Sequence, residues 1–109
     1  ANMYDGYYQS AQKFQYGVAP VKRKNKWGMI NLKGMWVCRP KYSQINRLDN
    51  GLMLAKIDGY IGLTDINGAF LAPMKYLQLD ISKENIFLLE TSDGVDYLRS
   101  DGRWIWRSN

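Results

Sequence analysis

The stretch "KWGMINLKGMWVCRPKY", Lys26–Tyr42, decides the fold of this chain. It joins short segments of aromatic and branched residues through glycine, and such segments favour β-strands and turns over helices. It also carries Lys and Arg, but no evident catalytic set. The stretch is therefore either a cationic, aromatic binding strip or one unit of a packed scaffold. The scaffold positions in it are Trp27, Gly28, Gly34, Trp36, Pro40 and Tyr42.

The same features recur along the chain at a spacing of 34 residues. A shift of 34 lays Gly34 on Gly68, Gly68 on Gly102 and Tyr42 on Tyr76. A fixed period of this kind is the sequence signature of a repeat protein, in which one unit cannot bury its own apolar face and neighbouring units stack. The predicted units are approximately residues 17–50, 51–84 and 85–109, with residues 1–16 as a partial unit or cap.

The glycines of the repeat predict hairpin turns. Lys33, Asn67 and Asp101 precede the three repeated glycines, and Asn-Gly or Asp-Gly between apolar runs indicates a two-residue turn with positive φ at both positions. A pair of helices, the other fold with a period of this length, would not tolerate glycines at these places. Two further turns are predicted at Asp58-Gly59 and Asp93-Gly94.

Each unit is predicted to be a three-stranded antiparallel meander followed by a connector. The connectors, "RPKYSQINRLDN" and "PMKYLQLDISKE", carry either a short helix or a further strand. Pro40 cannot donate to a sheet and holds its predecessor extended, so it should close the third strand of the first unit. The predicted fold class is all-β, with repeated three-stranded meanders stacked into a curved or barrel-like sheet.

Length and composition place the chain among small folded domains. Its 109 residues form a single domain, and 46% hydrophobic residues are enough to build a core. The lone Cys38 excludes an internal disulfide, and the absence of His leaves no imidazole base for a Cys or Ser nucleophile. Turn chemistry accounts for Asp93 and Asp101. We therefore expect a non-enzymatic protein without metal or cofactor, and an enzyme acting through carboxylates is the alternative left open.

Charge is unevenly distributed along the chain. Residues 1–48 contain nine Lys or Arg and one acidic residue, Asp5, for a formal charge of +8, whereas residues 49–109 contain six against nine, for −3. Lysines beside aromatic rings could contact an anionic polymer such as a nucleic acid or an acidic glycan, but lysine-rich turns are also ordinary solvated hairpin tips. The candidate basic contact residues are Lys22, Arg23, Lys24, Lys26, Lys33, Arg39, Lys41 and Arg47.

The C-terminal segment "RWIWRSN" is a second candidate contact surface. Strand alternation predicts Trp104 and Trp106 on one face and Ile105 on the other. Both faces of this strand are then apolar. The strand is therefore either covered by a partner or folded under the preceding unit as a cap.

The unit "GVAPVKRKNKWGMINLKGMWVCRPKY" resembles the bacterial WG repeat. The pattern of that family, Lys-Trp-Gly-x-Ile-Asp, a turn, Gly, an aromatic residue and Pro-x-Tyr, fits the first unit best. The second unit keeps Gly62, Gly68 and Tyr76, and in the third Asp96 replaces the first glycine. The mid-strand glycines, Gly28 and Gly62, indicate either close approach of a ring to the backbone or a kink that curls the sheet.

The resemblance implies a non-enzymatic binding or scaffolding module of a bacterial protein, without catalytic residues. We expect it to mediate protein–protein interaction, with another protein or another domain of a larger chain as partner. The alternative is an anionic-polymer binder acting through the basic N-terminal half. The sequence shows no signal-peptide pattern and no run long enough to span a bilayer, and it distinguishes neither a cytoplasmic from an exported protein nor one oligomeric state from another.

Overall fold

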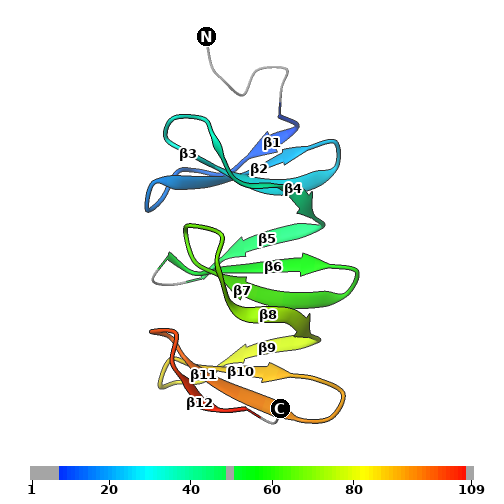
Figure 1. Cartoon of the computed structure of the whole chain (residues 1–109), viewed down its shortest axis with the longest axis vertical. Helices are drawn as coiled ribbons and strands as arrows, with labels where there is room; N and C mark the ends of the chain where they lie inside the picture. Colours follow the sequence, from blue (N-terminus) through cyan, green and yellow to red (C-terminus); the bar gives the residue numbers. More distant parts are fainter. Residues whose placement is uncertain (1–7, 49–50, 108–109) are drawn as a thin grey trace.

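The computed structural model describes residues 8–48 and 51–107, which form β-strands joined by turns and confirm the all-β class. Figure 1 shows three sheets stacked along the long axis, each of four antiparallel strands in chain order. The first sheet contains β1 (Ser10–Ala11), β2 (Val18–Arg23), β3 (Lys26–Asn31) and β4 (Trp36–Tyr42). The second contains β5 (Gln44–Arg47), β6 (Met53–Ile57), β7 (Tyr60–Thr64) and β8 (Phe70–Tyr76). The third contains β9 (Gln78–Ile81), β10 (Ile86–Glu90), β11 (Val95–Arg99) and β12 (Trp104–Trp106).

Each meander has four strands, so the predicted number of three is wrong. Of the two alternatives predicted for the connector, the further strand is confirmed. It is the first strand of the following sheet, because β5 pairs with β6 and β9 pairs with β10. The chain passes from one sheet to the next at Ser43 and Leu77, and the backbone N–H of each donates across to the second strand of the new sheet. The equivalent donor–acceptor pairs, spaced 34 residues apart, are Gln9–Lys22, Ser43–Lys56 and Leu77–Glu90.

The stacked sheets do not close into a barrel, so the barrel-like alternative is wrong. The molecule measures 48 × 26 × 20 Å, and each sheet keeps two edge strands. The chain leaves each sheet after the fourth strand instead of pairing that strand with the first. Apolar side chains that a barrel would enclose are buried between successive sheets instead.

The predicted two-residue turn is confirmed at Asp58-Gly59, and the β2–β3 hairpin closes with a turn of the same type at Lys24-Asn25. At the other turn predicted with it, Asp93-Gly94 between β10 and β11, neither residue has positive φ, so that turn type is wrong. Lys24 and Asn25 have φ of 54° and 66°, and Asp58 and Gly59 have φ of 52° and 86°. Turns with positive φ at both positions match the twist of the flanking strands. The side chain of Gln9 holds the first turn, because it accepts a hydrogen bond from the backbone N–H of Asn25 and donates to Oδ1 of the same residue at 3.2 Å.

The turns at Gly34, Gly68 and Gly102 lie where predicted, but their predicted type is wrong. In each of these turns the glycine has positive φ, at 77°, 81° and 93°, but the residue before it does not. Each glycine N–H donates to the carbonyl three residues earlier, which makes a type I turn followed by a left-handed glycine. In the first sheet, Asn31 Oδ1 also accepts from the backbone N–H groups of Lys33 (2.9 Å) and Met35 (3.0 Å).

Gly28 and Gly62 allow a bulged strand to cross close to them. A Cβ at Gly28 would lie 2.5 Å from the carbonyl oxygen of Cys38 and 2.8 Å from the nitrogen of Pro40. A Cβ at Gly62 would lie 3.1 Å from the ring of Phe70. Pro40 lies inside β4 at a register shift, where the ladder needs no donor, so the prediction that it closes the strand is wrong.

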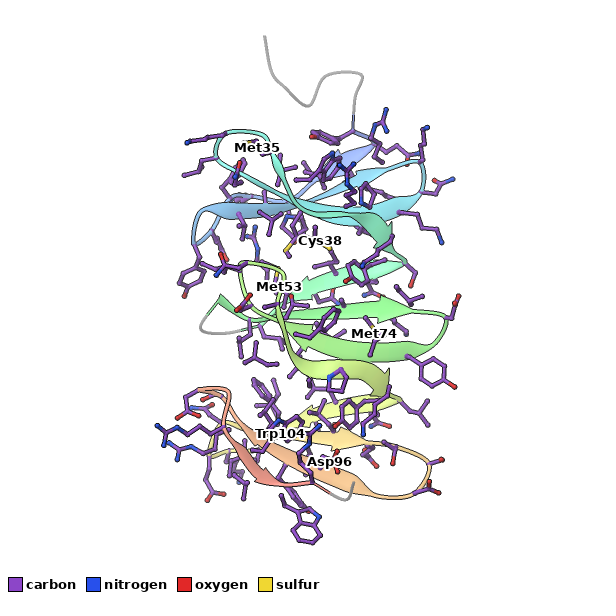
Figure 2. The ribbon with its side chains drawn as sticks, in the orientation of Figure 1. Met35, Cys38, Met53, Met74, Asp96 and Trp104 are labelled. Atoms are coloured by element: carbon purple, nitrogen blue, oxygen red, sulfur yellow. The ribbon has the colours of Figure 1, made fainter. Side chains whose placement is uncertain are left out.

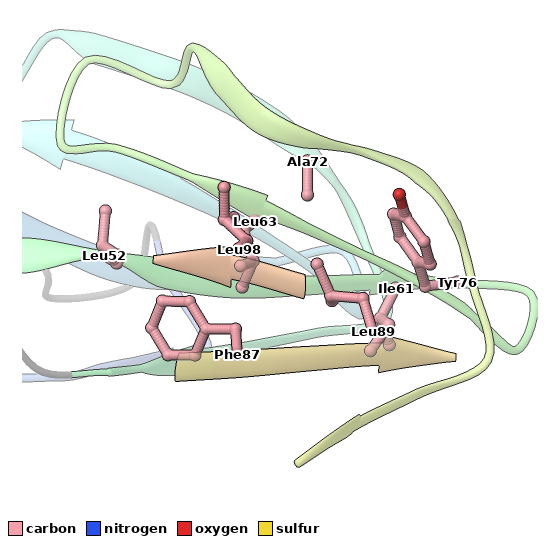
Figure 3. Close-up of a cluster of buried hydrophobic side chains, with 8 residues drawn as sticks. All are labelled: Leu52, Ile61, Leu63, Ala72, Tyr76, Phe87, Leu89 and Leu98. Carbon is pink, nitrogen blue, oxygen red and sulfur yellow. The ribbon is translucent and has the colours of Figure 1, made fainter. Parts of the chain in front are cut away.

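Most of the buried apolar side chains lie in two clusters, one between each pair of neighbouring sheets. Burying a side chain of this size contributes about 1.5–3 kcal/mol, so packing between sheets is the main stabilising term. Figure 3 shows the cluster between the second and third sheets, with Leu52, Ile61, Leu63, Ala72, Tyr76, Phe87, Leu89 and Leu98. The cluster between the first and second sheets contains Val18, Met29, Tyr42, Ile45, Met53 and Ala55.

Candidate binding surfaces

Four of the predicted basic residues gather at the β2–β3 hairpin. Lys22 and Arg23 end β2, Lys24 lies in the turn and Lys26 begins β3. Arg23 and Lys26 are cross-strand partners. Lys24 and Lys26 are exposed, and the other two are half-buried. The hairpin therefore places these four basic residues, which are close together in the sequence, at one end of the first sheet.

Arg39 and Lys41 extend this group along β4, and both are exposed. The pairing of Trp27 with Tyr42 places the end of β4 beside the start of β3, next to Lys26. The ammonium of Lys41 lies 5.4 Å from the centroid of the Tyr42 ring, which is a cation–π distance. We define the basic surface as Lys22, Arg23, Lys24, Lys26, Arg39 and Lys41.

Lys33 and Arg47 lie apart from the basic surface. Lys33 occupies the β3–β4 turn, at the opposite end of β3 from Lys26. The Arg47 guanidinium donates to the backbone carbonyl of Lys13 and, at 3.1 Å, to that of Val18. Burial lowers the pKa of Arg47, because desolvation disfavours its charged form. This arginine therefore joins the first sheet to the second through backbone oxygens.

Trp104 and Trp106 lie at the other end of the stack on opposite faces of β12, so their predicted common face is wrong. Trp104 pairs with Leu98 and Trp106 with Tyr97, and directly paired residues share a face. Leu98 and Tyr97 are consecutive and so point to opposite faces. The register shift makes Ile105 a bulge that interrupts alternation. Trp104 packs on the cluster between the second and third sheets (Figure 2).

A row of three paired side chains crosses each sheet on the face directed toward the C-terminal end of the stack. In the first two sheets the next sheet covers this row, and Met29 and Leu63 are 1% and 0% exposed. In the third sheet, Tyr97 is 37% exposed and Trp106 is 58% exposed. The rows are Pro20–Met29–Cys38, Leu54–Leu63–Ala72 and Leu88–Tyr97–Trp106. We call the third row, Leu88, Tyr97 and Trp106, the open face.

Sequence reasoning selects Trp106 for this end of the molecule but misses Leu88 and Tyr97. The available signal is the 34-residue alignment, which lays both residues on core positions of the earlier sheets. Two acidic residues accompany the open face. Asp80 is the cross-strand partner of Leu88, and Glu90 lies two residues after Leu88 on the same side of β10.

The formal charge falls from each sheet to the next along the stack. Residues 10–42 contain eight Lys or Arg and no acidic residue, residues 44–76 contain three of each, and residues 78–106 contain three basic and six acidic residues. The formal charges of the three sheets are therefore +8, 0 and −3. The basic surface and the open face lie in the two terminal sheets of a molecule 48 Å long.

The repeated sheet, with its glycine beneath a bulged strand, matches a known family. A family model described as the WG containing repeat matches residues 5–27 and 27–60, which together cover more than half of the chain. The chain belongs to the WG containing repeat family. The matched segments take in the whole first sheet and β5 and β6 of the second. No curated protein matches the chain.

The third sheet of this WG repeat protein departs from the motif at Asp96, which stands at the position of the motif glycine. Asp96 is 1% exposed, and its Oδ2 accepts a hydrogen bond from the Tyr76 hydroxyl at 2.6 Å. Burial, and then this hydrogen bond, raise the pKa of Tyr76. One repeat earlier, burial and the neighbouring Cys38 raise the pKa of Tyr42. Asp96 therefore links the third sheet of the WG repeat protein to the second.

Two further carboxylates of the WG repeat protein, those of Asp65 and Asp101, serve its turns. A groove between the second and third sheets is lined in part by Asp65 and Asp101. Asp65 accepts from the backbone N–H groups of Asn67 and Ala69, and Asp101 pairs with Arg99 at 3.0 Å. Within residues 8–48 and 51–107, no group of three or more His, Cys, Asp and Glu could hold a metal ion. The same residues form no helix long and apolar enough to cross a membrane.

Proposed function

We propose that this WG repeat chain is a non-enzymatic binding module that docks a protein partner on its open face. One observation carries the proposal: the row that is buried in the first two sheets ends the third sheet with Tyr97 37% and Trp106 58% exposed. Tyrosine and tryptophan are enriched among the residues that supply most of the binding free energy in protein interfaces. The open face thus combines the geometry of an internal interface with the residue types of an external one.

Continuity with the internal interfaces indicates the chemistry of the partner. The third sheet presents Phe87 and Leu89 to the row of the second sheet, and a partner sheet with an apolar face of that kind would cover the open face in the same way. Asp80 and Glu90 beside the open face, and the charge of −3 on the third sheet, favour basic side chains around that apolar face. The proposed partner is therefore an apolar β-sheet face with a basic rim on another polypeptide.

The test uses the whole chain as affinity bait in three forms: wild type, Trp106→Ser and the control Tyr60→Ser. Tyr60 is 48% exposed but lies at the start of β7 in the second sheet. A protein retained by the wild type is then purified and titrated against all three forms. We expect Trp106→Ser to weaken its binding about tenfold or more, and Tyr60→Ser to leave it unchanged, because only Trp106 belongs to the open face.

Circular dichroism and thermal melting check that both variants keep the wild-type fold. A purified partner that binds Trp106→Ser as tightly as the wild type contradicts the proposal. So does a partner whose binding falls equally in Tyr60→Ser, because that result places the contact away from the open face. Leu88→Asp provides a second variant at the open face and is expected to weaken the same partner.

A further inference from the structure

We infer that the basic surface of the first sheet binds the phosphate backbone of double-stranded nucleic acid, independently of the open face. The first observation is that the segment forming the first sheet contains no acidic residue. No Asp or Glu occurs in the sequence between Gly6 and Leu48, although the first sheet carries eight Lys or Arg. Like charges held together repel, and a duplex with one negative charge per about 1.7 Å of axis relieves that repulsion.

The exposed members of the basic surface come from one hairpin and the neighbouring strand. Lys24 and Lys26 lie at the hairpin, and Arg39 and Lys41 lie on β4, which pairs with β3. All four side chains are exposed, so all four can reach a ligand without rearrangement of the sheet. Four cations on adjacent strands about 4.8 Å apart form a compact site for a polyanion.

Backbone geometry at the hairpin tip supports a ligand contact at Lys24. Its φ of 54° lies in the left-handed region, where a side chain other than Asn, Asp or Gly is uncommon and carries strain. The equivalent turn of the second sheet has Asp58 and Gly59, which suit this conformation. Gln9 braces the first turn through its two hydrogen bonds to Asn25. The strained lysine is thus held at the tip of a braced hairpin.

The surroundings of the hairpin favour contacts to phosphates over contacts to bases. Trp27 packs against the cluster between the first and second sheets, so its ring does not form an open stacking platform. Tyr16 is 64% exposed, but it lies in the turn before β2, at the far end of that strand from the hairpin. Single-stranded nucleic acid is recognised by stacking on aromatic rings, whereas backbone contacts need only placed cations. This arrangement favours a duplex bound without base readout.

The test is fluorescence anisotropy of a labelled DNA duplex of about 20 base pairs with the whole chain, at several salt concentrations. Four phosphate contacts predict that binding weakens about a hundredfold between 50 and 200 mM salt. Lys24→Asn/Lys26→Gln leaves two contacts, so we expect weaker binding that falls only about tenfold over the same range. The matched control, Lys75→Gln/Lys83→Gln, removes the same charge from exposed residues of the other sheets and should behave as the wild type.

Several outcomes would overturn the inference. They are binding that does not depend on salt, no binding at 50 mM salt, and equal loss of affinity in the two double variants. Tighter binding of single-stranded DNA, or of a sulfated glycan of equal charge, would assign the surface to a different polymer. Trp106→Ser should bind the duplex as the wild type does, so failure of the open-face proposal leaves this test unaffected. Circular dichroism verifies the fold of each variant.

Discussion

The first and third sheets share one strand order and one set of repeated backbone hydrogen bonds, but they present different surfaces. The first sheet has no acidic residue, buries its row under the second sheet and exposes cations at a strained hairpin. The third sheet has twice as many acidic as basic residues and exposes Tyr97 and Trp106. The differences lie in side chains that the backbone pattern does not require. The family scaffold can therefore keep its fold while its surfaces change.

The largest expected effect on stability comes from substituting the glycine of the WG motif. Gly28→Ala should lower the free energy of unfolding by about 3 kcal/mol, because the added Cβ would lie 2.5 Å from a backbone oxygen and rigid strand atoms cannot move away. Gly62→Ala should cost about 1 kcal/mol, because its closest contact is 3.0 Å. Urea denaturation measures both. Equal losses at the two positions would show that the crossing strand is as close in the second sheet as in the first.

In the third sheet, Asp96 stands at the position of that glycine. The next test removes the hydrogen bond that Asp96 accepts from Tyr76. Tyr76→Phe should lower the free energy of unfolding by about 2 kcal/mol, because it removes a donor from a buried carboxylate. Tyr42→Phe should cost less, because the residue one repeat before Asp96 is Gly62, which offers no carboxylate. Thermal denaturation of both variants measures the difference. A loss at Tyr42 equal to that at Tyr76 would contradict this account of Asp96.

The stability of the protein at alkaline pH depends on both tyrosines. The raised pKa values of Tyr42 and Tyr76 mean that the folded state holds these protons more tightly than the unfolded state, whose tyrosines titrate near pH 10. Their contribution is fully present below about pH 10 and is lost as the pH rises above that value. Denaturation at a series of pH values should show this decline. The double variant Tyr42→Phe/Tyr76→Phe should show a shallower one, and an unchanged decline would exclude these residues as its cause.

The smallest expected effect concerns the hairpin of the first sheet. Lys24→Asn should raise the free energy of unfolding by about 0.5 kcal/mol, because Asn adopts positive φ at lower cost. Asp58→Asn, at the equivalent turn position of the second sheet, should leave stability nearly unchanged. Chemical denaturation at high salt, where surface charge repulsion is screened, isolates the backbone effect. A loss of stability in Lys24→Asn would contradict the strain assigned to this turn.

Much of the fold could be predicted from glycine spacing, because the local rules that place turns depend on few residues. Gly34, Gly68 and Gly102 predict the repeat and the position of a turn in each sheet. The fourth strand could be predicted only as one of two alternatives for the connector, because "QINR" and "QLDI" become strands by pairing with β6 and β10 of the next unit. The predicted type of the turns at these three glycines is also wrong, because one additional residue before the glycine changes a two-residue turn into a longer one.

The two surfaces could be predicted in part. The basic hairpin could be predicted because its residues are close together in the sequence. The contact of Arg47 with backbone carbonyls of the first sheet could not, because it depends on how the first two sheets stack. The bulge at Ile105 reverses the face of Trp106, and no local pattern reveals it. The 34-residue alignment matches Leu88 and Tyr97 to core positions of the earlier sheets, but only the structure shows that no following sheet covers them. Tertiary packing therefore decides which candidates reach the surface.

Single residues, Ser43 and Leu77, connect one sheet to the next, and this arrangement has a mechanical consequence. Among the described residues no backbone ladder joins one sheet to the next, so adjacent sheets are held together by side-chain packing and a few side-chain hydrogen bonds. Tension on the chain ends would separate apolar faces one pair at a time instead of shearing a continuous block of hydrogen bonds. Each sheet that unravels would lengthen the chain by about 100 Å. Under load, the molecule would extend in steps, as a spacer with a few discrete lengths.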